Sequence, residues 1–257
     1  MLNKHNIVSS TEMLIITADD FGIDKQATDS ILFSYKTGRI TSISAMVFMQ
    51  DSMRASEMAS GLDVEIGFHL NLTLPLSGSD VNSKLLEHQH VVASFLLSSK
   101  FTQIIYNPLL RKSFDFVFKA QEEEFYRLYE RAPAFYNGHH HMHLCANIIL
   151  GKYLPRKIPI RRTFTFAWGE KDPFNIIYRR LLDHYISRRY ISSDAFYSLG
   201  PVEEFEKIKK IIRLSEIKNI ELMVHPNRKE EFQFLQSDDY LKLISDKDLG
   251  HFSDLIK

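Results

Sequence analysis

The stretch Met13-Leu14-Ile15-Ile16-Thr17-Ala18-Asp19-Asp20-Phe21-Gly22 decides the fold that we expect of this 257-residue chain. A continuous apolar run ends in two adjacent carboxylates. Continuous apolar runs are typical of parallel strands that are buried on both faces. In parallel α/β folds the chemistry lies where such strands end. The stretch therefore predicts a buried parallel strand with a functional site at its carboxyl end.

Similar short apolar, β-prone runs recur along the chain and alternate with helical patterns. The predicted strands cover residues 13–17, 42–48, 64–70, 134–137, 158–163, 195–198 and 220–224. The predicted helices include residues 25–36, 52–60, 121–131, 173–187 and 202–215. Such alternation indicates βαβ units and a parallel sheet.

About seven strands are one fewer than the standard eight-stranded barrel has. We therefore expect an α/β fold, an irregular (β/α) barrel of about seven parallel strands, with an open doubly wound sheet as the alternative. The region 73–115 shows no clear pattern, and we expect it to form an irregular loop excursion over one face. Residues 1–257 are expected to form a single domain.

Composition excludes several classes of protein. Lys and Arg number 32, as do Asp and Glu, so the basic excess that is usual for binding nucleic acid or anionic membranes is lacking. Cys145 is the one cysteine, so no internal disulfide can form. The first ten residues do not resemble a secretory signal, and no apolar run reaches about 18 residues. We expect a cytoplasmic protein; the sequence leaves a homodimer open.

Each polar cluster at a predicted strand end has a functional and a structural interpretation. Of Asp19 and Asp20, one can bind a cation while the other acts as a base; alternatively, one caps the helix that begins near residue 24 or shapes a turn before Gly22. His69 ends the strand 64–70, where a lone histidine is more often a hydrogen-bonded core residue. His225 ends the strand 220–224, and a turn residue is an equal alternative.

A run of four histidines lies at residues 139–143, in Gly138-His139-His140-His141-Met142-His143. An engineered tag would lie at a terminus, which leaves a solvated patch or a metal site; neutral imidazole is the commonest biological metal ligand. In an extended segment His139, His141 and His143 would share one face, whereas in a helix His139 and His143 would. Spacing therefore does not choose among them.

Taken together, the three clusters indicate a metal site more strongly than any one of them does alone. One Asp and two His from different strand ends suffice for a three-ligand metal site with open positions for water and substrate. Such a metal polarises a carbonyl and lowers the pKa of its water, so that hydrolysis becomes feasible near neutral pH.

Four motifs resemble, in order, those of the YdjC-like carbohydrate deacetylases, which include the chitooligosaccharide (diacetylchitobiose) deacetylases. They are Ala18-Asp19-Asp20-Phe21-Gly22, Gly67-Phe68-His69-Leu70, the histidine run 138–143, and Met223-Val224-His225-Pro226. The resemblance extends from about residue 13 to residue 226.

The resemblance implies an irregular β/α barrel related to polysaccharide deacetylases, and removal of an N-acetyl group from a small N-acetylated amino sugar or chitooligosaccharide. It also implies a divalent metal ion, Mg²⁺ or Zn²⁺. The roles that it assigns are metal ligand for Asp20, His69 and His139, general base for Asp19, general acid for His225, and orientation of the base for Arg161.

The chain departs from the family pattern at Asn137, where many members carry Asp. If that position supports a metal ligand, Asn keeps a hydrogen bond but loses the charge. Aromatic residues near predicted strand ends could stack on a sugar ring, although core packing is their commoner fate. They are Phe21, Trp168, Phe196 and Tyr197.

Two rival functions are a metal-dependent phosphoesterase and a sugar- or metal-binding protein that lacks catalysis. A phosphoesterase would more often carry further carboxylates for a second metal, or a Gly-rich phosphate cradle, and the sequence shows neither. Pure binding requires neither the base Asp19 nor the acid His225, so the presence of both favours an enzyme.

Overall fold

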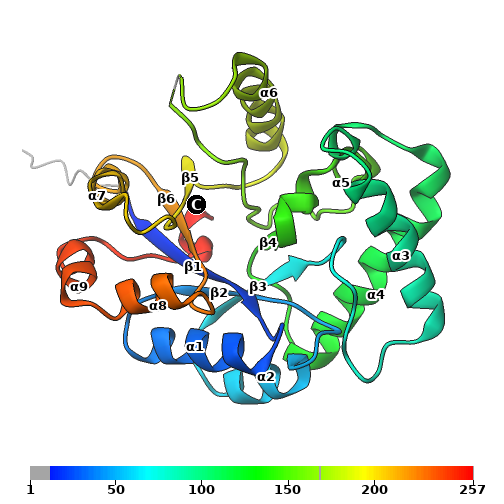
Figure 1. The fold of residues 1–257 in the computed structure, drawn as a ribbon, viewed down its shortest axis with the longest axis horizontal. Coiled ribbons are helices and arrows are strands. Elements are labelled where there is room, and N and C mark those ends of the chain that lie inside the picture. The colour runs from blue at the N-terminus through cyan, green and yellow to red at the C-terminus, as the bar shows by residue number, and fades with distance from the viewer. Residues whose placement is uncertain (1–11, 168, 257) are drawn as a thin grey trace, which may run out of the picture.

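The computed structural model describes residues 12–167 and 169–256 and shows one parallel sheet surrounded by helices (Figure 1). The first ten residues, which we do not expect to form a secretory signal, lie outside the described residues. The strands are β1 (Leu14–Phe21), β2 (Ser42–Ala45), β3 (Glu65–Leu70), β4 (Tyr136–Gly138), β5 (Ala195–Ser198) and β6 (Ile220–Val224). All neighbours pair in parallel, in the order β4-β3-β2-β1-β6-β5. The predicted α/β fold is confirmed, and β1 lies inside the sheet.

The fifth of the seven predicted strands, residues 158–163, is an irregular segment that lies between β4 and β5 in the chain. The Arg161 amide donates to the Tyr136 carbonyl of β4 (3.0 Å), and the Thr165 amide donates to the Phe196 carbonyl of β5 (2.9 Å). Its regular pairing is reduced to isolated bridges at Pro159 and Ile160. Because proline has no amide hydrogen, Pro159 cannot donate to a ladder. The described residues therefore form six strands and not seven, and this segment joins the two edges of an irregular barrel.

Nine helices of the described residues surround the sheet (Figure 1). They are α1 (Lys25–Lys36), α2 (Ser52–Ala59), α3 (Ser83–Leu97), α4 (Arg111–Tyr129), α5 (Ala146–Gly151), α6 (Pro173–Arg189), α7 (Phe205–Leu214), α8 (Lys229–Leu235) and α9 (Asp238–Ile244). The N-cap of α1 is Asp24, whose Oδ1 accepts from the Ala27 amide (2.8 Å). Neither Asp19 nor Asp20 therefore caps this helix. None of these helices has both the length and the apolarity that crossing a bilayer requires.

The region 73–115 is largely helical, so the expectation of an irregular loop is wrong. It holds α3, the 3₁₀ turns η1 (Thr102–Ile104) and η2 (Pro108–Leu110), and the start of α4. The Asn82 side chain caps α3 by accepting from the Leu85 amide (2.9 Å). Leu85, Val92 and Leu96 form the buried side of α3, at the spacing that one face of a helix requires.

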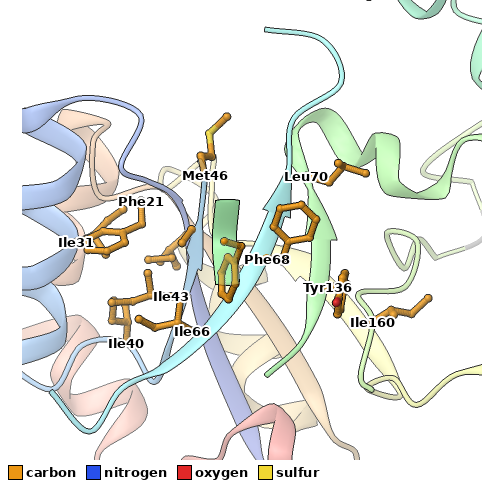
Figure 2. Packing of buried hydrophobic residues seen from close by; sticks show 14 of the residues in the cluster. Phe21, Ile31, Ile40, Ile43, Met46, Ile66, Phe68, Leu70, Tyr136 and Ile160 are labelled. Atoms are coloured by element: carbon orange, nitrogen blue, oxygen red, sulfur yellow. The ribbon is translucent and has the colours of Figure 1, made fainter. Parts of the chain in front are cut away.

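The two faces of the sheet differ in polarity because successive strand residues point to opposite sides. One face is apolar and packs beneath the helices; Figure 2 shows Ile43, Ile66 and Phe68 in this core. The Phe68 ring makes edge contacts with Phe118 and Phe125, with centroids 6.0 and 5.7 Å apart. The opposite face carries buried polar side chains, which are Thr17, Asp19, Ser42, Ser44, His69, Asn137 and Glu221.

Candidate active site

The two adjacent carboxylates lie at an irregularity in β1. The register with β2 shifts between Ala18 and Phe21, and Asp20 has a φ of 69°. In a regular strand, neighbouring side chains point to opposite faces, whereas a bulge redirects one of them. Asp19 contacts Arg161, and Asp20 contacts two histidines. The irregularity thereby places both carboxylates in one site.

Asp20, His69 and His139 form a compact group of metal-ligand side chains. Asp20 Oδ1 lies 2.9 Å from His139 Nδ1 and 3.3 Å from His69 Nε2. One donor atom from each residue lies within 4.8 Å of the other two, and among the residues described this is the group that could hold an ion. Two imidazoles and a carboxylate match a three-ligand site with open positions.

Asn137 contacts the side of the His69 ring that faces away from Asp20. Its Oδ1 accepts from Ser44 Oγ (2.8 Å) and lies 2.7 Å from His69 Nδ1. Because a carbonyl oxygen can only accept, His69 Nδ1 carries a proton, and Nε2 is the nitrogen that faces Asp20. Asn137 therefore orients His69 as a carboxylate would, but adds no charge.

The charges of the group stabilise one another. Burial alone would raise the pKa of Asp20, but hydrogen bonds from His139 and His69 hold that pKa well below its usual value. Burial opposes the imidazolium form of His69, yet the charge of Asp19 and the contact with Asp20 raise the pKa of His69 overall. A metal cation bound in place of the imidazole protons would likewise stabilise the charged form of Asp20.

A buried ion network lies beside the metal-ligand group. Arg161 Nη1 and Nη2 contact the two carboxylate oxygens of Asp19 at 2.5 and 2.8 Å, and Arg161 Nε donates to Glu221 Oε1 (2.6 Å). All three side chains are almost fully buried. The guanidinium also lies over the Phe196 ring, 4.7 Å from its centroid. These contacts fix both the position and the orientation of Asp19.

The two carboxylates of this network differ in proton affinity. Burial would raise the pKa of Asp19, but the Arg161 charge and hydrogen bonds lower it to about 2. Burial raises the pKa of Glu221 to about 7, despite its contact with Arg161. Asp19 is therefore ionised at neutral pH, although both carboxylates share one guanidinium.

Glu221 is a component of the site that none of the strand-end motifs includes. The available signal was an acidic residue within an apolar strand, Ile220-Glu221-Leu222-Met223-Val224. Glu221 pairs in register with Ile15 of β1, on the sheet face that also carries Thr17 and Asp19. A charge at such a position is rarely buried unless it has a partner.

We predict that Glu221→Leu lowers the free energy of unfolding by about 3–5 kcal/mol, because the charged Arg161 would lose one of its two buried partners. Glu221→Gln should be less destabilising, since its amide oxygen can still accept from Nε. Urea denaturation of both variants and the wild type measures this difference. Equal losses of unfolding free energy in the two variants would show that the hydrogen bond from Arg161 Nε does not account for the destabilisation.

His225 follows β6 directly, next to the end of β1, since Val224 pairs with Ala18. Its backbone amide donates to Glu231 Oε2 (2.7 Å), and its Nδ1 lies 3.6 Å from Glu231 Oε1. Glu231 is itself buried and also accepts from Arg228. The positive form of His225 would be close enough to Asp19 to lower the pKa of that carboxyl. His225 and Asp19 thus belong to one electrostatic site.

The histidine run is neither an extended segment nor a regular helix. His140 and His141 have φ values of 52° and 59°, so a strand-like alternation of side chains does not apply. In an extended segment His140 would point away from His139, whereas here the two ring centroids lie 4.1 Å apart. His139 alone of the run joins Asp20 and His69.

The other histidines of the run have separate contacts. His140 Nδ1 lies 3.1 Å from Thr73 Oγ1, and His143 Nε2 donates to the Arg161 carbonyl (3.0 Å). The His141 ring packs against Phe164, with centroids 4.5 Å apart. Burial lowers the pKa of His143 to about 3 and that of His141 well below its usual value, so both are neutral. His143 therefore anchors the backbone that carries Arg161.

The aromatic residues proposed to stack on a sugar have different fates. Phe21 and Phe196 are fully buried, so neither presents a face to a ligand. Phe196 instead stacks on Phe164, with centroids 4.5 Å apart. Tyr197 is half-buried beside the apolar core, and Trp168 lies outside the described residues.

The sequence is similar to those of proteins that are named as carbohydrate deacetylases. A carbohydrate deacetylase of Danio rerio is 27% identical over 138 residues, which is 52% of this chain and 43% of that protein. Chitooligosaccharide deacetylases are 24% identical over 230 residues in Yersinia pestis (strain Pestoides F) and 25% identical over 223 residues in Proteus mirabilis (strain HI4320). These two matches cover 84% and 83% of this chain, and 81% of each relative.

A solved structure shares the fold. It is a protein of Enterococcus faecalis V583, named for a proposed role in cellobiose-phosphate cleavage. The TM-score is 0.68 at 19% identity, over 96% of this chain and 100% of that one. The family model described as YdjC-like protein matches residues 13–249, which include all six residues predicted for the site. This chain therefore belongs to the YdjC-like family.

Proposed function

We propose that this protein is a metal-dependent hydrolase that removes the N-acetyl group from an N-acetylated amino sugar. The observation that carries the proposal is the group of Asp20, His69 and His139 next to an ionised Asp19 held by Arg161. The names of the relatives, carbohydrate deacetylase and chitooligosaccharide deacetylase, support the substrate class.

Each residue of the site has a distinct role in the proposed amide hydrolysis. A divalent metal on Asp20, His69 and His139 would polarise the acetyl carbonyl and lower the pKa of the attacking water, so that a weak base suffices. Asp19 accepts the proton of that water, and Arg161 keeps both carboxylate oxygens in place. His225 donates a proton to the amine that leaves.

The donor set bears on which metal is used. Imidazole suits zinc and other transition metals, whereas magnesium prefers carboxylates, carbonyls and water. Two nitrogen donors and one oxygen donor in the group favour Zn²⁺ over Mg²⁺. We therefore propose zinc as the native metal.

The test is acetate release from diacetylchitobiose by the purified protein, with and without a chelator. We expect release that the chelator abolishes and that added Zn²⁺ restores. Asp20→Asn, purified in the same way, controls for contaminating hydrolases. Chelator-resistant release would contradict metal dependence. Saccharide binding without acetate release would favour the binding protein, and chelator-sensitive hydrolysis of p-nitrophenyl phosphate alone would favour the phosphoesterase.

Asn137 offers a second prediction. Asn137→Ala should weaken metal binding by about 10–100-fold, the usual effect of removing a group that orients a ligating histidine. Asn137→Asp should retain the affinity, because a carboxylate can also accept from His69 Nδ1. Metal titration against a competing chelator measures both.

His140→Ala is the matched control for Asn137→Ala. Its ring lies beside His139 but outside the metal-ligand group, so we expect unchanged metal affinity. A loss in the control equal to that of Asn137→Ala would show that general disturbance of the site is the cause.

A further inference from the structure

A cavity of about 770 Å³ opens beside the histidine run, between the region of η1 and helix α6. Its volume is in the upper part of the range for small-molecule sites, which is about 300–1,000 Å³. His140 and His141 belong to its lining, so the cavity adjoins the metal-ligand group through His139.

The polar atoms without partners in this cavity lie on residues next to the site. His141 Nδ1 and Thr163 Oγ1 are buried and have no hydrogen-bond partner. Both residues line the cavity, and Thr163 follows Arg161 closely in the chain. Unsatisfied buried polar atoms are costly, so a polar ligand group bound here would be favoured. The hydroxyl groups of a sugar supply such a partner.

The wall formed by α6 offers a different surface. Its polar side chains are engaged with one another, because Asp172 caps the helix at the Asn175 amide (3.0 Å) and Arg179 Nε donates to Asn175 Oδ1 (2.6 Å). Tyr178, Lys100 and Gln103 add further polar groups, but apolar side chains make up the larger part of the exposed lining. The apolar side chains that line the cavity are Phe101, Ile104, Leu144, Phe164, Phe174 and Leu182.

Apolar side chains of the lining are exposed on both sides of the cavity, and on α6 they continue beyond it. On α6, Phe174, Ile177 and Leu181 are 85%, 50% and 65% exposed, at a spacing that places them on one stripe. Across the cavity, Phe101 and Ile104 are also exposed. Figure 1 shows α6 standing out from the body of the protein. Exposed apolar side chains that gather beside a cavity in this way are typical of a binding site.

We propose that this cavity and its rim bind an apolar aglycone, so that the substrate is an N-acetylated amino sugar carrying a hydrocarbon chain. The inference rests on the proposed function and narrows its substrate class. The polar end of the cavity adjoins the metal-ligand group and takes the sugar, and the apolar end takes the chain. A second saccharide unit would find few hydroxyl partners there, because Ile104, Leu144 and Leu182 belong to the apolar side chains that make up the larger part of the exposed lining. A second copy of the protein on the rim would cover the mouth through which substrate enters.

The test compares acetate release from the methyl and octyl β-glycosides of N-acetylglucosamine, below the micelle concentration of the latter, with diacetylchitobiose. We expect kcat/KM for the octyl glycoside to exceed that for the methyl glycoside by about 10–100-fold, mainly through KM, because each buried methylene adds apolar contact. Phe174→Ser and Leu181→Ser should abolish this preference, mainly by raising KM for the octyl glycoside. Leu241→Ser, which removes an exposed apolar side chain on α9, should keep it.

Calorimetry of both glycosides with the metal-loaded protein separates the two claims. Tighter binding of the octyl glycoside without any acetate release would overturn the proposed function and leave the aglycone site standing. Equal binding and equal kcat/KM for the two glycosides would overturn the aglycone site. A kcat/KM for diacetylchitobiose above that for the octyl glycoside would also overturn the aglycone site. In that case the release of acetate would still support the deacetylase.

Discussion

Asp19→Asn is expected to lower kcat by about two to four powers of ten, the usual contribution of a general base. The substitution removes the proton acceptor but keeps the size of the side chain. KM should change much less, because the interaction that is lost acts mainly in the transition state. Arg161 holds both oxygens of Asp19, so the wild-type carboxylate is fixed and ionised before substrate arrives.

Steady-state kinetics and thermal unfolding of Asp19→Asn distinguish this role from a structural one. Arg161 keeps its contact with Glu221 in the variant, so the fold should survive. Asp24→Asn is the matched control, because Asp24 caps α1 and asparagine caps equally well. Near-normal turnover in Asp19→Asn would remove the proposed base and favour the binding-protein interpretation.

The regular part of the fold was predictable because its physical signals are local. The apolar run at residues 13–16 marks β1, and the helix predicted at residues 25–36 has the bounds of α1. Asp20, His69 and His225 each lie where a parallel strand ends, and such ends meet at one edge of a sheet. The pattern therefore indicated that these side chains would be neighbours, while their roles remain predictions.

What could not be predicted depends on backbone irregularity and long-range pairing. The left-handed conformations of His140 and His141 follow from no spacing rule, so the pattern could not separate His139 from the other histidines. Arg161 lies in a segment that resembles a strand but pairs only at isolated bridges. Its partners Asp19 and Glu221 are 142 and 60 residues away in the chain.

His69→Ala is expected to reduce bound metal to background and to lower kcat/KM by about three powers of ten or more, since polarisation by a metal contributes several kcal/mol and each 1.36 kcal/mol is tenfold in rate. His69 is almost fully buried, and Asn137 holds its Nδ1, so its Nε2 has no equivalent replacement nearby. Elemental analysis after zinc loading and desalting measures the metal directly.

The control for His69→Ala must show that the loss is not unfolding. Asn137 Oδ1 still accepts from Ser44 Oγ when the imidazole is absent, so the substitution does not leave this oxygen without a hydrogen-bond partner. A cooperative thermal transition should therefore persist, and His140→Ala, from the same cluster of rings, should keep its bound metal. Undiminished metal content together with full turnover in His69→Ala would exclude this residue as a ligand. Metal loss without any loss of turnover would instead separate the ion from the hydrolysis.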